Sequence, residues 1–167
     1  MINLINGRGQ LGSVLTKRIQ YIKHPSNDIY IYHTWNIDDK SEKVQMKCFE
    51  ELKSFINGHL DDRVIFISTK SQKESYYVKY KQLAEVYILS HCEDSTIIRL
   101  PTIIGKGTVE KLKKKEVRPY GTMELMSIDE ACDEILKYIF YYKGLLKTIS
   151  IDGEKIKART IQKVLSI

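Results

Sequence analysis

The sequence predicts an α/β protein in which a mostly parallel β-sheet carries helices on both faces. Short apolar runs typical of strands alternate along the chain with longer segments whose apolar residues recur at helical spacing. Such alternation is typical of parallel sheets covered by helices. A chain of 167 residues without internal repeats or a low-complexity linker is expected to form one domain.

The individual elements follow in order from these patterns. Residues 2–6 are predicted to form a strand and residues 11–23 a helix, which ends at the turn-forming cluster 24–27. β-Branched and aromatic residues predict a strand at 29–32, and helical apolar spacing predicts a helix at 44–57 that ends near Gly58. The predicted elements after these are strand 63–68, helix 74–91, strand 96–100, a short helix near 108–115, strand 123–128, helix 129–142, strand 147–151 and helix 158–165.

Three glycines form a G-x-G-x-x-G pattern between the first strand and the first helix, at positions 7, 9 and 12. Glycines here permit a tight turn and let a pyrophosphate approach the helix N-terminus closely. The pattern therefore predicts dinucleotide binding by Gly7, Arg8, Gly9, Gln10, Leu11 and Gly12. The alternative is a glycine turn that only packs the helix against the sheet.

Composition narrows the class of protein. A hydrophobic fraction of 43% and a charged fraction of 29% are ordinary for a globular protein, and no stretch approaches the length of a membrane span. Cys48, Cys92 and Cys132 lack metal-ligand spacing, which favours packing thiols in a reducing cytoplasm and no metal. The net charge of +6 is compatible with several anionic partners, but no nucleic-acid motif accompanies it, and neither a nucleic acid nor a membrane is expected as partner.

Tyr77 and Lys81 stand four residues apart in a predicted helix and therefore project from one face. A lysine ammonium beside a tyrosine lowers the pKa of the phenol, because the positive charge stabilises the phenolate. This arrangement suits general acid–base chemistry on an alcohol or a carbonyl. The alternative is a tyrosine on the surface of an amphipathic helix.

Together these segments resemble the extended short-chain dehydrogenase/reductases, the family of sugar-nucleotide epimerases, dehydratases and reductases. The matching segments are the glycine loop 7–12, the strand 64–69, the Y-x-x-x-K-x-x-A-E set at 77–85, the segment 97–107 and the segment 126–131. The resemblance implies a Rossmann-like fold, NAD or NADP as cofactor, and a nucleotide sugar as substrate. It also implies a homodimer formed through helices 44–57 and 74–91.

The resemblance assigns catalysis to Thr69, Tyr77 and Lys81. Tyr77 would be the general acid or base, Thr69 would hold the substrate oxygen, and Lys81 would lower the tyrosine pKa and bind the nicotinamide ribose. It assigns two further residues, His33 and Pro101, to the cofactor. Lysine rather than an acid follows Thr69, which favours reduction or epimerisation over dehydration.

The same resemblance places Thr102 against the substrate. Met123 stands where many members carry the arginine that binds the substrate diphosphate. Arg118 is the candidate replacement, with the lysines at 113–115 as alternatives.

One departure concerns the segment after the first helix, where only the turn at 24–27 precedes strand 29–32. If 29–32 were the family's second strand, an acidic residue near its end should bind the adenosine ribose, but Tyr32, His33 and Thr34 stand there. We therefore align 29–32 with the fourth strand. The sheet would then lack its second and third strands, which form the wall of the adenine pocket.

This alignment predicts one truncated Rossmann-like domain over residues 1–167, with a cofactor-binding core at 1–100 and a reduced substrate-side region at 101–167. Two functions stay open. The first is an NAD(P)-dependent oxidoreductase or epimerase of nucleotide sugars. The second is a catalytically degenerate relative that binds a ligand or a partner protein, with weak or absent cofactor binding because the adenine wall is missing.

Overall fold

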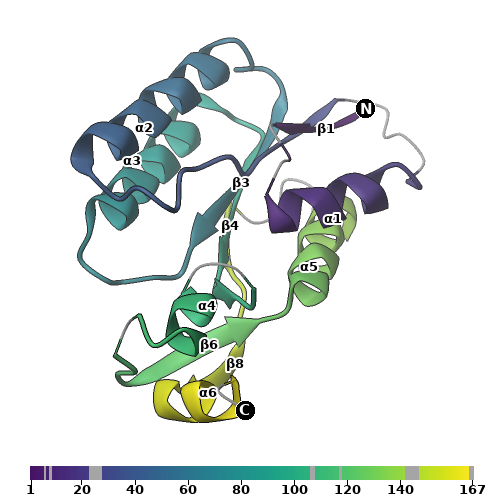
Figure 1. The fold of residues 1–167 in the computed structure, drawn as a ribbon. Helices are drawn as coiled ribbons and strands as arrows, with labels where there is room; N and C mark the ends of the chain where they lie inside the picture. The colour runs from purple at the N-terminus through teal and green to yellow at the C-terminus, as the bar shows by residue number, and fades with distance from the viewer. Residues whose placement is uncertain are drawn as a thin grey trace.

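The computed structural model describes residues 1–5, 7, 9–22, 28–105, 108–116, 118–141 and 147–165. These residues form a five-stranded sheet and, below it in Figure 1, a smaller sheet of three strands. The strands of the large sheet, in spatial order and all parallel, are β1 (Ile2–Ile5), β2 (Ile29–Tyr32), β3 (Arg63–Thr69), β4 (Ser95–Leu100) and β7 (Thr148–Ser150). In the small sheet, β6 (Thr122–Met126) lies between β5 (Thr102–Ile103) and β8 (Glu154–Lys157).

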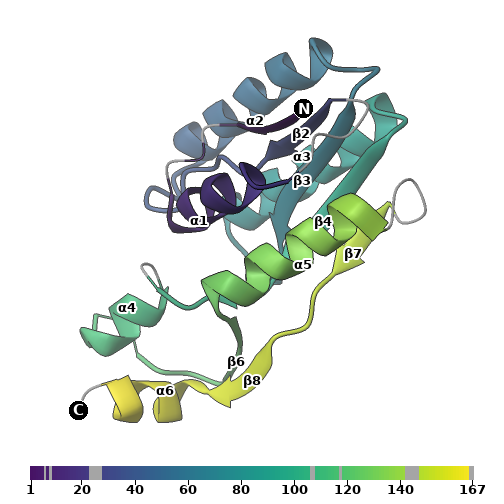
Figure 2. The ribbon, with the colours of Figure 1, turned by 90° about the vertical axis from the view of Figure 1, so that its right-hand side faces the viewer.

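Helices cover both faces of the large sheet, as predicted. Helices α2 (Glu42–Asn57) and α3 (Tyr76–His91) lie side by side on one face. Helices α1 (Gln10–Ile19) and α5 (Ile128–Tyr141) lie together on the other, where Arg18 pairs with Asp129 at 2.6 Å (Figure 2). The short helices α4 (Thr108–Lys113) and α6 (Ala158–Leu165) pack against each other beside the small sheet. Along the described part of the chain, no helix combines the length and the apolar character needed to cross a membrane.

Strand β3 shows why the sequence folds into three layers. Its side chains alternate between two apolar clusters, with Ile65 and Ile67 on the side of α1 and α5, and Val64 and Phe66 on the side of α2 and α3. A strand buried on both faces needs a continuous apolar run, which is what residues 64–67 supply. The free cysteines take part in the same packing, since Cys132 belongs to the first cluster and Cys92 to the second.

The first strand lies at the edge of the large sheet. Among the described residues, β1 pairs with β2 alone, in a register that places Ile2 opposite Ile29. In the doubly wound dinucleotide-binding fold the first strand lies inside the sheet, between the second and the fourth. The structure therefore places residues 29–32 where the fourth strand lies, and the described residues contain no counterpart of the second and third strands.

Two strands of the small sheet were not predicted, and several helices begin or end at other residues than predicted. β5 has only two residues, and β8 is a charged Glu-Lys-Ile-Lys segment with one apolar residue. Helix α1 ends at Ile19, and α3 begins at Tyr76 because the Ser75 hydroxyl caps it by accepting from the Val78 amide at 3.3 Å.

Lys70 ties the small sheet to the carboxyl end of β3. Its Nζ lies 2.8 Å from Glu124 on β6 and 2.8 Å from Asp152, which precedes β8. Gly153 allows this close approach, since a Cβ atom there would lie 2.4 Å from the Leu125 carbonyl oxygen. The small sheet with α4 and α6, called the small lobe below, is thus held where the strands of the large sheet end (Figure 1).

Candidate active site

Thr69 and Tyr77 meet at the carboxyl end of β3. Thr69 is the last residue of the strand, and its Oγ1 accepts from the Ser71 amide at 3.1 Å, which turns the chain toward α3. Tyr77 lies in the first turn of α3, where hydrogen bonding to the Thr69 side chain acts to lower the pKa of its phenol. The structure thus brings together the two hydroxyls that the sequence analysis paired.

The pKa of the Tyr77 phenol is higher than the sequence analysis predicted. Burial raises its pKa to about 12, because the phenolate would lose its hydration, while the hydrogen bond to Thr69 acts in the opposite direction. The expectation that Lys81 would lower this pKa is wrong for this structure. At neutral pH the phenol is therefore protonated.

Lys81 is buried one turn along α3 and points at the sheet. Its Nζ donates to the Ile67 carbonyl oxygen at 2.7 Å and lies 4.6 Å from the Trp35 ring and 4.5 Å from the Phe66 ring. Burial lowers the pKa of Lys81 to about 7, although the carboxylate of Glu85 favours the charged form. Because the ammonium is directed at this carbonyl and these rings, its charge does not offset the desolvation of Tyr77.

A buried ion pair fixes the register of α3. The carboxylate of Glu85 accepts from Arg99 Nε on β4, at 3.1 Å from each of its oxygens. The helix therefore turns Lys81 and Glu85 toward the sheet, while Leu83 and Val86 point to solvent. Residues 81 and 85 are one turn apart, so this pairing also sets where Tyr77 lies.

The glycine loop forms a cradle at the carboxyl end of β1. Gly9 is the N-cap of α1, and no side chain caps the helix there. Apart from its two chain neighbours, no atom of the described residues lies within 4 Å of the place a Cβ would take. Gly7 and Gly12 are instead packed tightly, since a Cβ on Gly12 would lie 2.6 Å from the Gly7 carbonyl carbon. Open space at Gly9 beside an uncapped helix N-terminus fits a pyrophosphate group.

His33 lies against this loop, just after β2. Its Nε2 is buried, has no hydrogen-bond partner among the residues that the structure describes, and lies 2.5 Å from the position of a Cβ on Gly12. Burial lowers the pKa of His33, and the positive charge of Lys81 lowers it further. A neutral imidazole with an unsatisfied nitrogen faces the loop, which supports the placement of His33 near a ligand there.

The other predicted cofactor residues occupy different surroundings. Gln10 reaches from α1 toward the loop after β5, where a Cβ on Gly105 would lie 2.2 Å from its Oε1. Leu11 packs its side chain against an apolar cluster, which leaves only its backbone for a ligand. Pro101 is buried, and its Cγ would lie 2.9 Å from a Cβ on Gly153. Arg8 lies outside the described residues.

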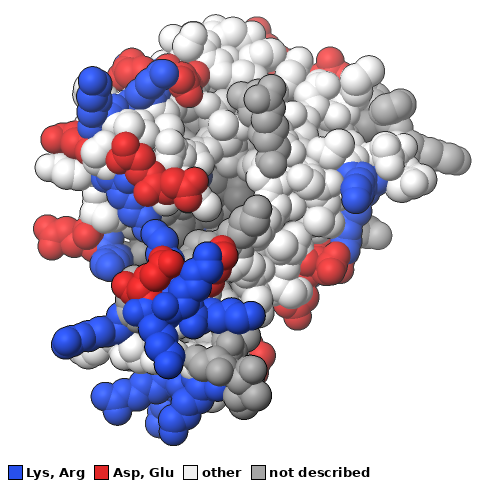
Figure 3. Space-filling view, viewed as in Figure 1, with Lys and Arg blue, Asp and Glu red and all other residues white. Residues whose placement is uncertain are grey.

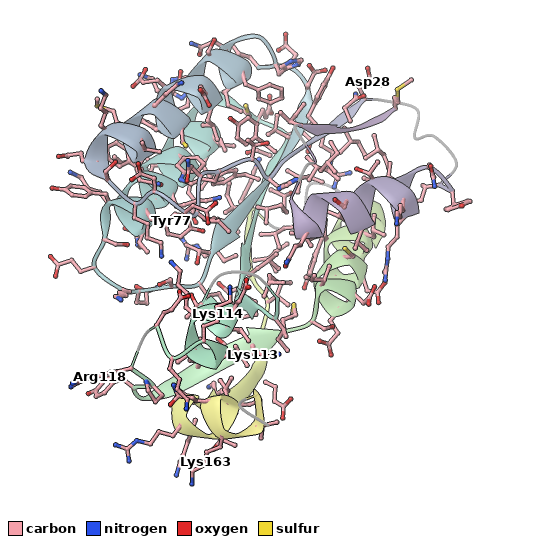
Figure 4. All side chains as sticks on the ribbon, viewed as in Figure 1. Asp28, Tyr77, Lys113, Lys114, Arg118 and Lys163 are labelled. Carbon is pink, nitrogen blue, oxygen red and sulfur yellow. The ribbon has the colours of Figure 1, made fainter. Side chains whose placement is uncertain are left out.

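The two predicted substrate residues, Thr102 and Arg118, lie at different places relative to Tyr77. Thr102 is half-buried in β5, close in sequence to the end of β4. Arg118 is exposed on the small lobe, and Figure 4 shows it well separated from Tyr77. Over the described part of the chain, no three His, Cys, Asp or Glu side chains are grouped so that they could hold a metal ion.

Comparison with known proteins finds solved structures that share the fold of this chain. No protein-family model matches the chain, and no curated protein matches its sequence. Solved structures do match its fold. A monomeric L-threonine 3-dehydrogenase from a metagenome is 14% identical with a TM-score of 0.71, over 99% of this chain and 81% of that one. A dTDP-4-dehydrorhamnose reductase of Bacillus anthracis, solved with NADP, is 13% identical with a TM-score of 0.71, over 98% and 79%.

A third match is a dTDP-glucose 4,6-dehydratase of Streptomyces venezuelae, solved as a double mutant with NAD bound. It is 12% identical with a TM-score of 0.73, over 99% of this chain and 80% of that one. The chain therefore has the Rossmann-like fold of NAD(P)-dependent epimerases, dehydratases and sugar-nucleotide reductases, as the sequence resemblance implied. At sequence identities this low, the structural similarity shows that the fold is shared and nothing more.

Proposed function

We propose that the protein is an NAD(P)-dependent oxidoreductase or epimerase of a nucleotide sugar, with Thr69, Tyr77 and Lys81 as its catalytic set. The observation that carries the proposal is the position of Thr69, the last residue of β3, beside Tyr77 in the first turn of α3, where it lowers the pKa of the phenol. The glycine cradle stands at the carboxyl end of β1, in the same parallel sheet. Ligands of open α/β sheets bind at these strand ends.

The residues present fit one half of the dinucleotide. Gly9 and the N-terminus of α1 would hold the pyrophosphate, and His33 and Lys81 would face the nicotinamide half. The adenosine half has no wall among the described residues, because β1 is the edge strand. When bound, the cofactor would supply or accept hydride at a substrate carbon.

The protonation state of Tyr77 favours reduction as the direction of chemistry. A phenol with a pKa of about 12 keeps its proton at neutral pH, so it donates a hydrogen bond to a substrate carbonyl oxygen. If hydride were supplied to the carbonyl carbon, the oxygen would gain negative charge and Tyr77 would give it the phenolic proton. Thr69 is placed to hold the same oxygen, and its hydrogen bonding to Tyr77 favours the phenolate that is left.

One observation favours a second function, a non-catalytic protein that binds a ligand or partner on the same scaffold. The missing adenosine wall removes contacts that hold a dinucleotide. The raised pKa of Tyr77 also opposes its use as a base. Thermal melting with and without NAD(H) and NADP(H) separates the two functions, because only a ligand of the folded state raises the melting temperature.

Tyr77→Phe tests the catalytic assignment, with Tyr76→Phe as its matched control. Tyr76 is the exposed neighbour on the same turn, so its hydroxyl should not affect chemistry. We expect NAD(P)H oxidation with 4-keto nucleotide sugars to fall about 10²–10⁴-fold in Tyr77→Phe and to be unchanged in Tyr76→Phe. Equal turnover of the two variants would remove Tyr77 from the mechanism.

We further propose a homodimer through α2 and α3 in a reducing cytoplasm. Helix α3 exposes Leu83, Val86 and Leu89, with Val86 64% exposed, and Met46 is exposed on α2. An apolar face of this kind is typical of an interface. Sedimentation should show a dimer that Val86→Lys converts to a monomer, whereas a wild-type monomer would contradict the proposal. The three free cysteines fit the reducing compartment.

A further inference from the structure

Strand β1 leaves one side of its backbone without a partner among the described residues. On the other side it pairs with β2, where the Ile29 amide donates to the Met1 carbonyl oxygen at 2.8 Å. The bonding groups of a strand point alternately to its two sides, so Met1 and the other odd-numbered residues of β1 face β2. The amides and carbonyls of Ile2 and Leu4 therefore point away from the sheet, toward the place of a further strand.

The other edges of the two sheets are protected against such pairing. β5 has two residues, β7 has three, and β8 is the charged segment Glu-Lys-Ile-Lys. Charged side chains and very short strands are common means by which an edge avoids another chain. β1 has the sequence Ile-Asn-Leu-Ile, without a charge or a proline. In Figure 3, Lys and Arg side chains gather over the small lobe, whereas the surface over β1 is largely uncharged.

The sequence of β1 fits a second copy of itself in an antiparallel ladder. If Asn3 of the two copies lie opposite each other at a two-fold axis, Ile2 of each copy faces Leu4 of the partner subunit. Both residues have outward-facing backbone groups, so each such pair exchanges two hydrogen bonds. Their side chains also share a face, since Ile2 and Leu4 both pack against the cluster under α1 and α5. A shift of one residue would bring side chains of different faces together.

We propose that a second copy of the chain pairs its β1 antiparallel with this β1 and thereby completes the cofactor site. The two large sheets become one, and β1 and β2 of the partner lie on the side where the dinucleotide-binding fold has its second and third strands. A ladder this short is marginal alone, so cofactor bound across the seam should strengthen it. The contact is at the sheet edge and is separate from the interface proposed for α2 and α3.

The second copy also brings an acidic side chain to the cradle. Asp28 precedes β2, its Oδ1 contacts the Met1 nitrogen, and half of its side chain is exposed. In its own copy Asp28 lies at the amino end of the sheet, far from Tyr77 (Figure 4). In the antiparallel pair, Met1 of the partner subunit faces Ile5, the last residue before the glycine loop. Asp28 of the partner subunit is thus brought to the side of the cradle where the fold carries the carboxylate that binds the adenosine ribose. This role of Asp28 rests on the proposed function, whereas the strand pairing does not.

Disulfide trapping tests the strand pairing directly. Opposite residues of a non-hydrogen-bonded pair have Cα atoms about 4.5 Å apart, within the range of a disulfide. Asn3→Cys should therefore give a covalent dimer on oxidation with diamide, and faster with NADH or NADPH present. Ser150→Cys is the matched control, because it places an exposed cysteine on the other edge strand of the large sheet. Cross-linking of Asn3→Cys no faster than that of the control would overturn the proposal.

Charge substitutions at the same position separate pairing from folding. Sedimentation of the wild type should show its mass double when saturating cofactor is added. Asn3→Lys and Asn3→Glu each place like charges opposite each other and should weaken this association about fivefold, whereas an equimolar mixture of the two variants should associate like the wild type. Because a merely structural role of Asn3 gives no recovery on mixing, a mixture as weak as its components would refute the pairing.

Cofactor titrations distinguish this proposal from the proposed function. Asp28→Asn should bind NADH or NADPH about tenfold more weakly, as expected for loss of a charge-assisted hydrogen bond, and Gly9→Val should not bind it. Mixing these two variants should restore sites of wild-type affinity, because each supplies the part that the other lacks. Cofactor binding with unchanged mass and no recovery on mixing would overturn the shared site and leave the function standing. No cofactor binding, together with a cross-linked Asn3→Cys dimer, would refute the function and support the strand pairing.

Discussion

The packing of the glycine loop predicts different effects on stability for two alanine substitutions three residues apart. A Cβ on Gly12 would lie 2.5 Å from His33 Nε2 and 2.6 Å from the Gly7 carbonyl carbon, closer than packed atoms approach. The Gly7 backbone cannot give way as the end of a flexible side chain can. A Cβ on Gly9 would meet no atom of the described residues within 4 Å, its two chain neighbours aside, and the extended backbone of Gly9, with φ −78° and ψ 177°, suits any residue.

The magnitudes follow from these contacts. Overpacking costs about 1–3 kcal/mol, more where backbone must move, and replacing glycine inside a helix returns up to about 1 kcal/mol. We therefore expect Gly12→Ala to lower the free energy of unfolding by about 2 kcal/mol and the melting temperature by about 4–8 °C. For Gly9→Ala, losing glycine at the N-cap and restricting the unfolded chain nearly cancel, which leaves a change within about 0.5 kcal/mol.

Urea unfolding followed by circular dichroism measures both variants under the same conditions. The expected result is a shifted midpoint for Gly12→Ala and an unshifted one for Gly9→Ala, with equal slopes. Equal destabilisation of the two variants, or a stable Gly12→Ala, would refute the tight packing of the loop against His33.

Two further predictions concern buried polar groups. Gln45→Leu leaves the Trp35 indole and the Asn36 and Asp39 carbonyls without their partner, so unfolding in urea should show a loss of about 2–4 kcal/mol. An unchanged free energy of unfolding would contradict this role of Gln45. Lys81 has a pKa of about 7 when folded and 10.5 as its ordinary value, so between these pH values only the unfolded chain holds the proton. The free energy of unfolding of the wild type, relative to that of Lys81→Met, should therefore rise by up to about 4 kcal/mol as the pH increases from 7 to 10. A difference that does not change with pH would show that Lys81 is not buried as described.

Local patterns were sufficient to predict the large sheet. The apolar run at 64–67 and the strand-forming residues at 29–32 each predicted a buried strand, and the glycine loop marked the turn from the first strand to the first helix. The absence of an acidic residue after Tyr32 also led to the correct place of β2 in the sheet, beside an edge strand β1. These features depend on residues that are adjacent in the sequence.

The small lobe was predicted less completely, because its strands depend on distant contacts. β8 is charged and has one partly buried apolar residue, so neither an alternation of apolar residues nor the composition predicts a strand there. It forms because it pairs antiparallel with β6, with Glu154 opposite Leu125. A strand of two residues such as β5 has no sequence signal of its own.

The chemistry of the site was the hardest part to predict. Spacing alone placed Tyr77 and Lys81 on one face, but the direction of Lys81 depends on the Ile67 carbonyl and the Trp35 ring, which lie on other elements. The raised pKa of Tyr77 comes from burial that no local pattern reveals.

The account rests on a dinucleotide site at the glycine loop, and the single tryptophan offers the most direct test. Trp35 is buried beside Lys81, so its emission should be quenched, and nicotinamide emission sensitised, when NADH or NADPH binds. We predict saturable transfer for the wild type and none for Gly9→Val, whose side chain would occupy the place of the pyrophosphate; the circular dichroism spectrum of the variant checks that it is folded. No saturable transfer at millimolar cofactor, or equal transfer in both proteins, would contradict the account.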